Sequence, residues 1–166
     1  MVFRSEAAGL RGHLVVTGSV VMTSRGGGVS AVDSELLIDR SVVQDTASRA
    51  ADGLNGDGVV ILGAEPTEPH RPVAQIVASV IERNHRIGVV ASDAELTVES
   101  TIVRDTVGQE ADSLGGDGVY LDASQHTGEV SALSMVGALL DGNLEAAWPS
   151  EGLTCSATPS TSMVSR

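Results

Sequence analysis

The feature that most constrains the fold of this chain is an internal repeat with an offset of 60 residues. Residues 41–46 (SVVQDT) recur as residues 101–106 (TIVRDT), and residues 56–59 (GDGV) recur unchanged as residues 116–119. Matches of this length indicate that segments 60 residues apart adopt the same local structure. Repeats of this kind bury their apolar residues by stacking on their neighbours.

The repeat unit divides into a short coil of 22 residues and a long coil of 38. One polar column marks this division, at steps of 22, 38, 22 and 37 residues: Ser24, Thr46, Asn84, Thr106 and Asn143. The long coil has one insertion before its recurring glycine and a second insertion after it. The spacing therefore predicts a uniform spiral in which alternate coils carry two inserted loops.

Apolar residues recur at equivalent positions of each coil. Two columns, spaced by two residues, are Leu14, Leu36, Ala74, Leu96 and Leu133, and Val16, Ile38, Ile76, Val98 and Met135. Two further columns are Val20, Val42, Val80, Ile102 and Leu139, and Val29, Val59, Val89, Val119 and Trp148. A spacing of two with many β-branched residues is typical of strands. We therefore expect an all-β parallel β-helix (solenoid) of about five coils, stacked about 4.8 Å apart.

Composition excludes several classes of function. The formal net charge is −12, and the ten basic residues are all Arg, so counterion-releasing contacts with nucleic acid are not expected. The same charge opposes binding to anionic lipid, and no apolar run has the length of a membrane span. One cysteine, Cys155, rules out an internal disulfide, and no secretory signal is visible in the first residues. Aromatic residues make up only 2%, which suits a narrow coil interior.

The pattern divides the chain into three parts. Residues 1–12 are expected to be an N-terminal cap or leader, residues 13–150 the double-coil repeats, and residues 151–166 a flexible polar tail. An uncapped coil exposes unpaired backbone, so end-to-end self-association is expected if the coil ends are uncapped. We also expect the chain to be either a piece of a longer repeat array or a gene product that has lost its neighbouring repeats.

The repeats resemble a known family. Residues 41–46 with 50–53 (AADG), and residues 79–85 (SVIERNH) with 88–89, look like the right-handed parallel β-helix repeats of the pectate-lyase-like superfamily. They are most similar to large bacterial proteins of unassigned function that carry such double coils in tandem. The resemblance covers roughly residues 13–150. It implies a right-handed solenoid and an exported or cell-surface location.

Two acidic glycine loops are the candidate metal site. The first carries Asp52, Asn55 and Asp57, and its repeat keeps Asp112 and Asp117. Calcium prefers six to eight oxygen ligands from carboxylates and carbonyls on flexible turns. Alternatively, these residues form ordinary turns in which Asp and Asn bond to nearby backbone amides. The sequence leaves both interpretations open.

Repeated Asp and Arg residues form a second candidate site. Asp45 and Asp105 share a column next to Arg104, and Arg83 lies in the coil between them. Arginines of this kind could bind a substrate carboxylate through two hydrogen bonds. The resemblance implies that a polysaccharide lyase would use an arginine base together with calcium-bound aspartates. The favoured interpretation is a solvated ladder of charges that crosses from coil to coil.

The polar column is expected to be structural. Asn84, Asn143, Thr46 and Thr106 are interpreted as a turn ladder whose side chains bond to the backbone of neighbouring coils.

Two functions follow from these features. The first is a non-enzymatic β-helix repeat module, structural or surface-binding, that presents its loops to a polysaccharide or a protein. The alternative is a carbohydrate-active enzyme, either a polysaccharide lyase or a glycoside hydrolase, with its site on the loop-bearing face. The first is favoured because every notable feature occurs twice, whereas a catalytic site is usually unique. Calcium is the one cofactor that the sequence suggests.

Overall fold

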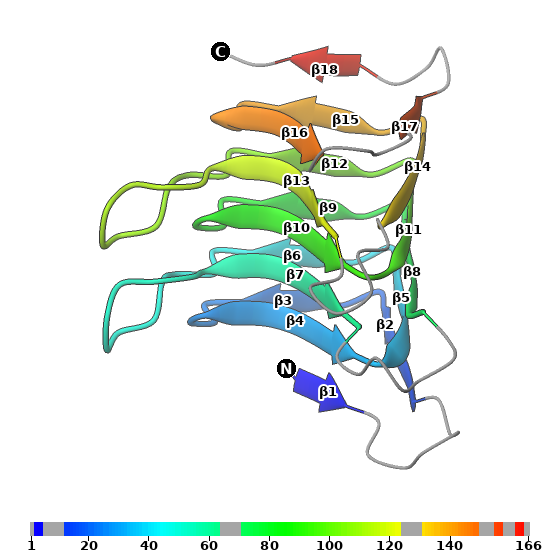
Figure 1. The fold of residues 1–166 in the computed structure, drawn as a ribbon, viewed down its shortest axis with the longest axis horizontal. Coiled ribbons are helices and arrows are strands. Elements are labelled where there is room, and N and C mark those ends of the chain that lie inside the picture. The colour runs from blue at the N-terminus through cyan, green and yellow to red at the C-terminus, as the bar shows by residue number, and fades with distance from the viewer. Residues whose placement is uncertain are drawn as a thin grey trace.

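The protein is a parallel β-solenoid. The computed structural model describes residues 2–4, 12–63, 71–123, 131–149, 155–157 and 162–164. Every regular element of these residues is a strand, and the 18 strands form three stacked sheets of parallel strands (Figure 1). The predictions of an all-β class and of parallel stacking are confirmed.

Each sheet contains six strands. Sheet A contains, in spatial order, β1 (Val2–Arg4), β4 (Gly27–Val32), β7 (Asp57–Leu62), β10 (Ile87–Ser92), β13 (Asp117–Asp122) and β16 (Glu145–Pro149). Sheet B contains β2 (Gly12–Thr17), β5 (Ser34–Asp39), β8 (Val73–Val77), β11 (Glu95–Glu99), β14 (Ala132–Val136) and β17 (Cys155–Ala157). Sheet C contains β3 (Val20–Met22), β6 (Val42–Gln44), β9 (Val80–Glu82), β12 (Ile102–Arg104), β15 (Leu139–Asp141) and β18 (Ser162–Val164).

The core is built from columns of equivalent side chains. Ile38 pairs in register with Val16 on one side and Ile76 on the other, and the two isoleucines are fully buried. Sheet A contributes Val29, Val59, Val89 and Val119, all without exposed surface. Since equivalent residues stack at the interstrand distance, a branched side chain that fits one coil also fits the next.

The column that begins at Val20 faces outward. On sheet C the buried column lies one residue later and contains Val43, Ile81, Val103 and Leu140. Successive side chains of a strand point to opposite faces. The outer face of sheet C therefore carries a stripe of half-buried or exposed apolar residues.

The position of Trp148 differs from the sequence prediction. Trp148 pairs in register with Tyr120, and Ala147 is the residue that continues the column of Val119. Asn143 precedes β16 by two residues, whereas Asn84 precedes β10 by three. This shorter turn shifts the strand by one residue, and a shift of one residue moves a position to the other face of a sheet.

Buried asparagines connect the coils at the corner between sheets C and A. The Asn84 Oδ1 atom accepts a hydrogen bond from the Thr46 backbone N–H at 3.1 Å, and Nδ2 donates to the Val43 carbonyl at 3.4 Å. Asn143 makes the equivalent bond to Thr106 at 3.1 Å. All four residues of the predicted turn ladder are buried.

Glycines next to this ladder leave room for it. A Cβ atom on Gly58 would lie 2.6 Å from the Asn84 Nδ2 atom and 2.6 Å from the Gly88 carbonyl oxygen. A Cβ on Gly88 would lie 2.7 Å from a methyl group of Val103. The close approach of neighbouring backbone and side chains therefore requires glycine at positions 28, 58 and 88.

A ladder of hydroxyl groups lies at the corner between sheets B and C. Ser41 Oγ accepts from the Ser19 N–H, Ser79 Oγ accepts from the Ser41 N–H, and Thr101 Oγ1 accepts from the Ser79 N–H, at 3.1–3.2 Å. The sequence interpretation missed this ladder, although the column of small hydroxyl residues is visible at the same spacings.

The two ends of the chain also contribute strands. β1 falls within residues 1–12, for which the sequence predicts a cap or leader, and β17 and β18 fall within the predicted tail. The second inserted loop of each long coil lies partly outside the described residues. Among the described residues, we find no helix with the length and apolar character needed to cross a membrane.

Candidate functional site

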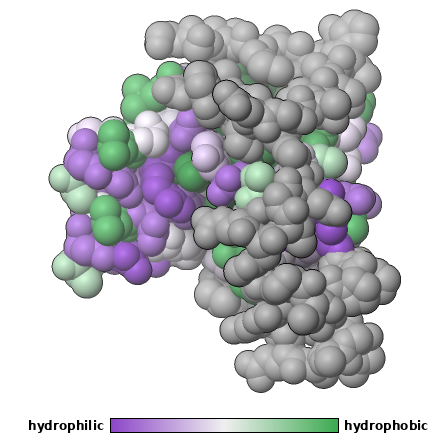
Figure 2. Space-filling view, viewed as in Figure 1, coloured by the Kyte–Doolittle hydropathy of each residue, from purple (hydrophilic) through white to green (hydrophobic). Residues whose placement is uncertain are grey.

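Two loops project from the corner between sheets C and A. They comprise residues 47–56 and 107–116, and together we call them the ledge. In Figure 1 they extend side by side to the left of the sheets, in cyan and yellow-green. Their surface is largely hydrophilic with isolated apolar residues (Figure 2), of which Leu114 is the most exposed.

Hydrogen bonds join the two loops. The Ala111 N–H donates to the Gly53 carbonyl at 3.0 Å, and the Asn55 N–H donates to Gln109 Oε1 at 2.9 Å. The Glu110 N–H donates to Ser48 Oγ at 3.1 Å, and Ser48 is fully buried. The ledge is therefore one body made by two loops that are 60 residues apart in the sequence.

Asp52 and Asp112 stabilise the turns at the tip of the ledge. Asp52 accepts from the Leu54 N–H at 3.1 Å and from the Arg49 guanidinium, and these contacts lower its pKa. Asp112 accepts from the Leu114 N–H at 3.0 Å and from Gln109 Nε2 at 2.9 Å, which also lowers its pKa. Both carboxylates thus act as local acceptors of backbone and side-chain donors.

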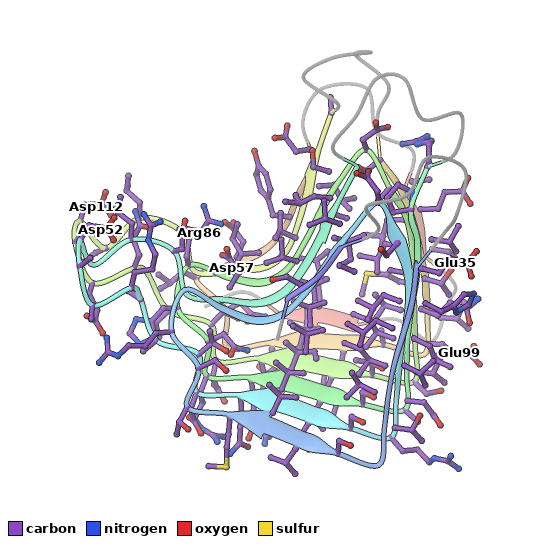
Figure 3. All side chains as sticks on the ribbon, turned by 90° about the horizontal axis from the view of Figure 1, so that it is seen from below. Glu35, Asp52, Asp57, Arg86, Glu99 and Asp112 are labelled. Atoms are coloured by element: carbon purple, nitrogen blue, oxygen red, sulfur yellow. The ribbon has the colours of Figure 1, made fainter. Side chains whose placement is uncertain are left out.

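Asp57 lies at the root of the ledge, where β7 begins. Its carboxylate is buried and accepts two hydrogen bonds from Arg86, one from Nε at 2.7 Å and a second from Nη2. Burial raises the pKa of Asp57, and the contacts with Arg86 oppose this effect. Figure 3 shows this pair at the root of the ledge, whereas Asp52 and Asp112 lie at its tip.

Asp117 and Asn55 occupy separate places around the same ledge. Asp117 begins β13, and its N–H donates to the Arg86 carbonyl at 3.1 Å. Asn55 has a φ of 62°, in the left-handed region, and its carbonyl accepts from Ser48 Oγ at 3.1 Å. Among the residues that the structure describes, no group of three or more His, Cys, Asp and Glu side chains is arranged to hold a metal ion. The calcium hypothesis stays a prediction.

The outer face of sheet A continues from the root of the ledge (Figure 3). One outward column contains Ser30, Val60, Val90 and Tyr120 in register. Tyr120 is half-buried, and its pKa is raised by partial burial and by the carboxylates of Asp122 and Asp117. Trp148 occupies the next register position of this column. Two of the three aromatic residues of the chain therefore occupy neighbouring register positions, a signal that the sequence interpretation missed.

The repeated Asp and Arg residues lie elsewhere, at the outer face of sheet C and the turn after it. Arg83 donates to the two carboxylate oxygens of Asp45 at 2.9 and 3.2 Å. Arg104 donates to Glu82 at 2.8 and 2.5 Å, and also lies 3.8 Å from Asp105. Burial tends to raise the pKa of Glu82, but hydrogen bonds from Arg104 and Arg83 outweigh it and lower the pKa. The Arg83–Asp45 and Arg104–Glu82 ion pairs therefore cross between neighbouring coils.

We compared the chain with protein-family models, with curated proteins and with solved structures, and none of the three comparisons gave a match.

Proposed function

We propose that the solenoid is a right-handed β-helix of about five coils, related to the pectate-lyase-like superfamily. The support for the handedness is general. Connections between parallel strands of one sheet are right-handed in nearly all known proteins. The support for the relationship is the resemblance of residues 41–46 with 50–53, and of residues 79–85 with 88–89, to the repeats of that superfamily.

We further propose that the protein is a non-enzymatic module that binds a polysaccharide across the ledge and the outer face of sheet A. The observation that carries this proposal is the bonding of the two loops into one body that adjoins this face. A surface that is ordered before binding loses little conformational entropy when a ligand binds. Binding surfaces are commonly loops held by a rigid scaffold, as here.

The contacts of the carboxylates favour binding over catalysis. Asp52 and Asp112 accept bonds from the turns that they stabilise, and Asp57 is held by Arg86 on two oxygens. Truncation of any one of them would disturb local structure first. Their role is therefore to order the surface.

The chemistry of the outer face of sheet A favours a neutral polysaccharide. Tyr120 offers an apolar ring with a polar hydroxyl, and Ser92 and Asp122 are half-buried polar residues on the same face. Equivalent positions of neighbouring coils repeat at about 4.8 Å, which suits a ligand that is itself repetitive. The net charge of −12 would repel an anionic polymer.

Isothermal titration against a panel of neutral, cationic and uronate polysaccharides tests this proposal. The Tyr120→Ala variant is expected to lower the affinity for the bound polymer about tenfold, equivalent to about 1.4 kcal/mol. Thr97→Ala, at a half-buried outward position of sheet B, is the matched control and should bind as the wild type does. Equal affinity of the Tyr120→Ala variant and the wild type would place the ligand elsewhere. Binding to a protein and to no glycan would overturn the ligand class.

One observation favours the alternative of a glycoside hydrolase. Asp57 has a raised pKa, and Asp117 lies in the same column two strands away, with a Cα separation of about 10 Å. Inverting hydrolases use a protonated carboxyl group and a carboxylate base roughly 6.5–9.5 Å apart. Loss of polysaccharide cleavage in both Asp57→Asn and Asp117→Asn would support this second function.

A further inference from the structure

Arg86 holds the second loop of the ledge through its main chain. It immediately precedes β10, on the short coil between the two coils that carry the loops. The Arg86 N–H donates to the Val107 carbonyl at 2.7 Å. The Arg86 carbonyl accepts from the N–H groups of Gly116 and Asp117 at 2.5 and 3.1 Å. These three bonds fix both the start and the end of the loop of residues 107–116.

The side chain of Arg86 holds the first loop. It donates to both oxygens of the Asp57 carboxylate, from Nε at 2.7 Å and from Nη2. Asp57 directly follows the loop of residues 47–56, and the pair lies where the ledge meets sheet A (Figure 3). A guanidinium that contacts two carboxylate oxygens fixes orientation as well as distance. Arg86 therefore connects the roots of both loops.

The burial of Asp57 makes this contact more than an ordinary surface ion pair. Asp57 is only 3% exposed, whereas ion pairs between exposed side chains contribute little to the position of either partner. Loss of the Arg86 guanidinium would leave the carboxylate buried without this charge. Such a group moves towards water or takes up a proton, and the first response would displace the root of the loop.

The corresponding positions of the other short coils do not repeat this contact. Gly26 immediately precedes β4, and Leu144 immediately precedes β16, as Arg86 precedes β10. Asp117 is the repeat equivalent of Asp57, but Leu144 has no side-chain donor with which to contact it as Arg86 contacts Asp57. The stacking of the coils therefore does not require an arginine at this position.

We propose that Arg86 is a positioning residue for the binding surface and that its contact with Asp57 fixes the ledge against the outer face of sheet A. This inference rests on the proposed function, since it concerns the placement of the surface that binds the polysaccharide. Arg86 acts through Asp57 and not by contact with the polymer. A surface that is fixed before binding loses less conformational entropy on binding, so loss of the pair weakens binding.

Isothermal titration with the polymer that the wild type binds tests this role. Arg86→Met keeps an apolar stem beside Gly115 and removes the donors, whereas Asp57→Ala removes the acceptor. Each variant should lower the affinity about tenfold, and so should the double variant, because all three lack the same contact. Wild-type affinity in Arg86→Met would overturn the proposal. Wild-type affinity in Asp57→Ala would overturn it as well, because Arg86 would then act without Asp57.

The double variant Asp57→Ala/Arg86→Met separates positioning from stability. Arg86→Met alone leaves a buried carboxylate without the guanidinium, whereas the double variant has no such charge, so the double variant should be more stable in urea. Its affinity should nevertheless stay as low as that of Arg86→Met. Recovery of affinity together with stability would show a merely structural role and would overturn the proposal.

Arg83→Ala is the matched control for these titrations. Arg83 belongs to the same coil and also donates to both oxygens of an aspartate on the neighbouring coil, Asp45, at 2.9 and 3.2 Å. This pair lies outside the ledge and sheet A. Arg83→Ala should therefore bind the polymer as the wild type does, and an equal loss of affinity in Arg83→Ala and Arg86→Met would contradict the specific role of Arg86.

Amide hydrogen exchange tests the positioning without a ligand. The Gly56 N–H donates to the Gly26 carbonyl at 3.1 Å, at the root that Arg86 holds. Its exchange should accelerate about tenfold in Arg86→Met and stay unchanged in Arg83→Ala. If the wild type binds no polysaccharide, the proposed function fails, while faster exchange at Gly56 still supports the hold of Arg86 on the ledge. If the wild type binds and Arg86→Met changes neither exchange nor affinity, the positioning role fails and the proposed function stands.

Discussion

The side-chain oxygen of Asn84 accepts a hydrogen bond from the backbone N–H of Thr46 on the neighbouring coil, at 3.1 Å. Asn143 and Thr106 repeat this relationship at the same distance, 60 residues further along the chain for Thr106 and 59 for Asn143. Both pairs are buried at the corner from which the ledge projects. The interior ladder therefore supports the position of the outer loops.

Replacement of Asn84 by alanine is expected to destabilise the protein by about 2–4 kcal/mol, because it leaves the Thr46 N–H and the Val43 carbonyl without their partner. Urea denaturation followed by circular dichroism measures this loss. Gln75→Ala, at an exposed position of β8, serves as the control and should change the free energy of unfolding by less than about 0.5 kcal/mol. Equal effects of the two variants would show that the ladder is not a stabilising element.

Gly58→Ala is expected to destabilise the protein by about 1–3 kcal/mol, because the new methyl group would overlap the Asn84 side chain and the Gly88 carbonyl. Gly27→Ala is the matched control, since a Cβ there would meet only Ser30 Oγ, at 3.2 Å. Thermal unfolding of both variants provides the comparison. A Gly58→Ala variant as stable as Gly27→Ala would contradict the assigned close approach.

The spacing of equivalent residues predicts the strands and the core because stacking repeats the same environment in every coil. The columns that contain Ile38 and Val59 follow directly from the step lengths, and both residues are fully buried. The spacing misplaces Trp148 by one register position, because the turn before β16 is one residue shorter than the turn before β10.

The geometry of the ledge depends on contacts that no local pattern contains. Ser48 bonds to the backbone of Glu110, 62 residues away, and Asn55 bonds to Gln109, 54 residues away. The repeat predicts two similar loops, but it does not predict that they contact each other. The Arg86–Asp57 pair was missed for a similar reason, since the two residues belong to coils of different length.

Ser48→Ala is expected to loosen the contact between the two loops. The variant loses the acceptor for the Glu110 N–H and the donor to the Asn55 carbonyl. Amide hydrogen exchange at Glu110 should accelerate about tenfold for a loss of about 1.4 kcal/mol of local stability. Exchange at Val103, a buried strand residue, is the internal reference and should not change. Unchanged exchange at Glu110 would show that the loops are independent.

Because its pKa is raised, Asp57 contributes less to the stability of the protein as the pH rises. Its pKa is raised by burial, so the folded state binds this proton more tightly than the unfolded state. Its contribution is present below the unfolded pKa of about 4 and is lost as the pH rises through the raised pKa. The unfolding free energy of Asp57→Asn minus that of the wild type should therefore increase from about pH 3 to pH 7.

Asp52→Asn provides the control for this titration. The pKa of Asp52 is lowered, first by the Leu54 N–H, so its contribution appears above the unfolded pKa and is lost on acidification. The unfolding free energy of Asp52→Asn minus that of the wild type should therefore decrease as the pH rises. Parallel pH profiles for the two variants would contradict the assigned environments.

If Asp52 and Asp112 serve only as acceptors within their turns, calcium should leave the melting temperature unchanged. The carboxylates of Asp52 and Asp112 already accept hydrogen bonds within their turns, and Asp57 pairs with Arg86. A ligand that prefers the native state must raise its stability, so thermal unfolding in millimolar calcium and in chelator is a direct test. A clear rise in calcium that Asp52→Asn or Asp112→Asn removes would establish the acidic loops as a metal site.

The proposed function is that the solenoid binds a polysaccharide without cleaving it. The most direct measurement incubates the wild type with each polymer that it binds and then determines the length of the recovered chains and the number of new ends. We expect the recovered polymer to be intact, and we expect the affinity to be lost in Tyr120→Ala. Cleavage by the wild type that disappears in Asp57→Asn and Asp117→Asn would contradict it.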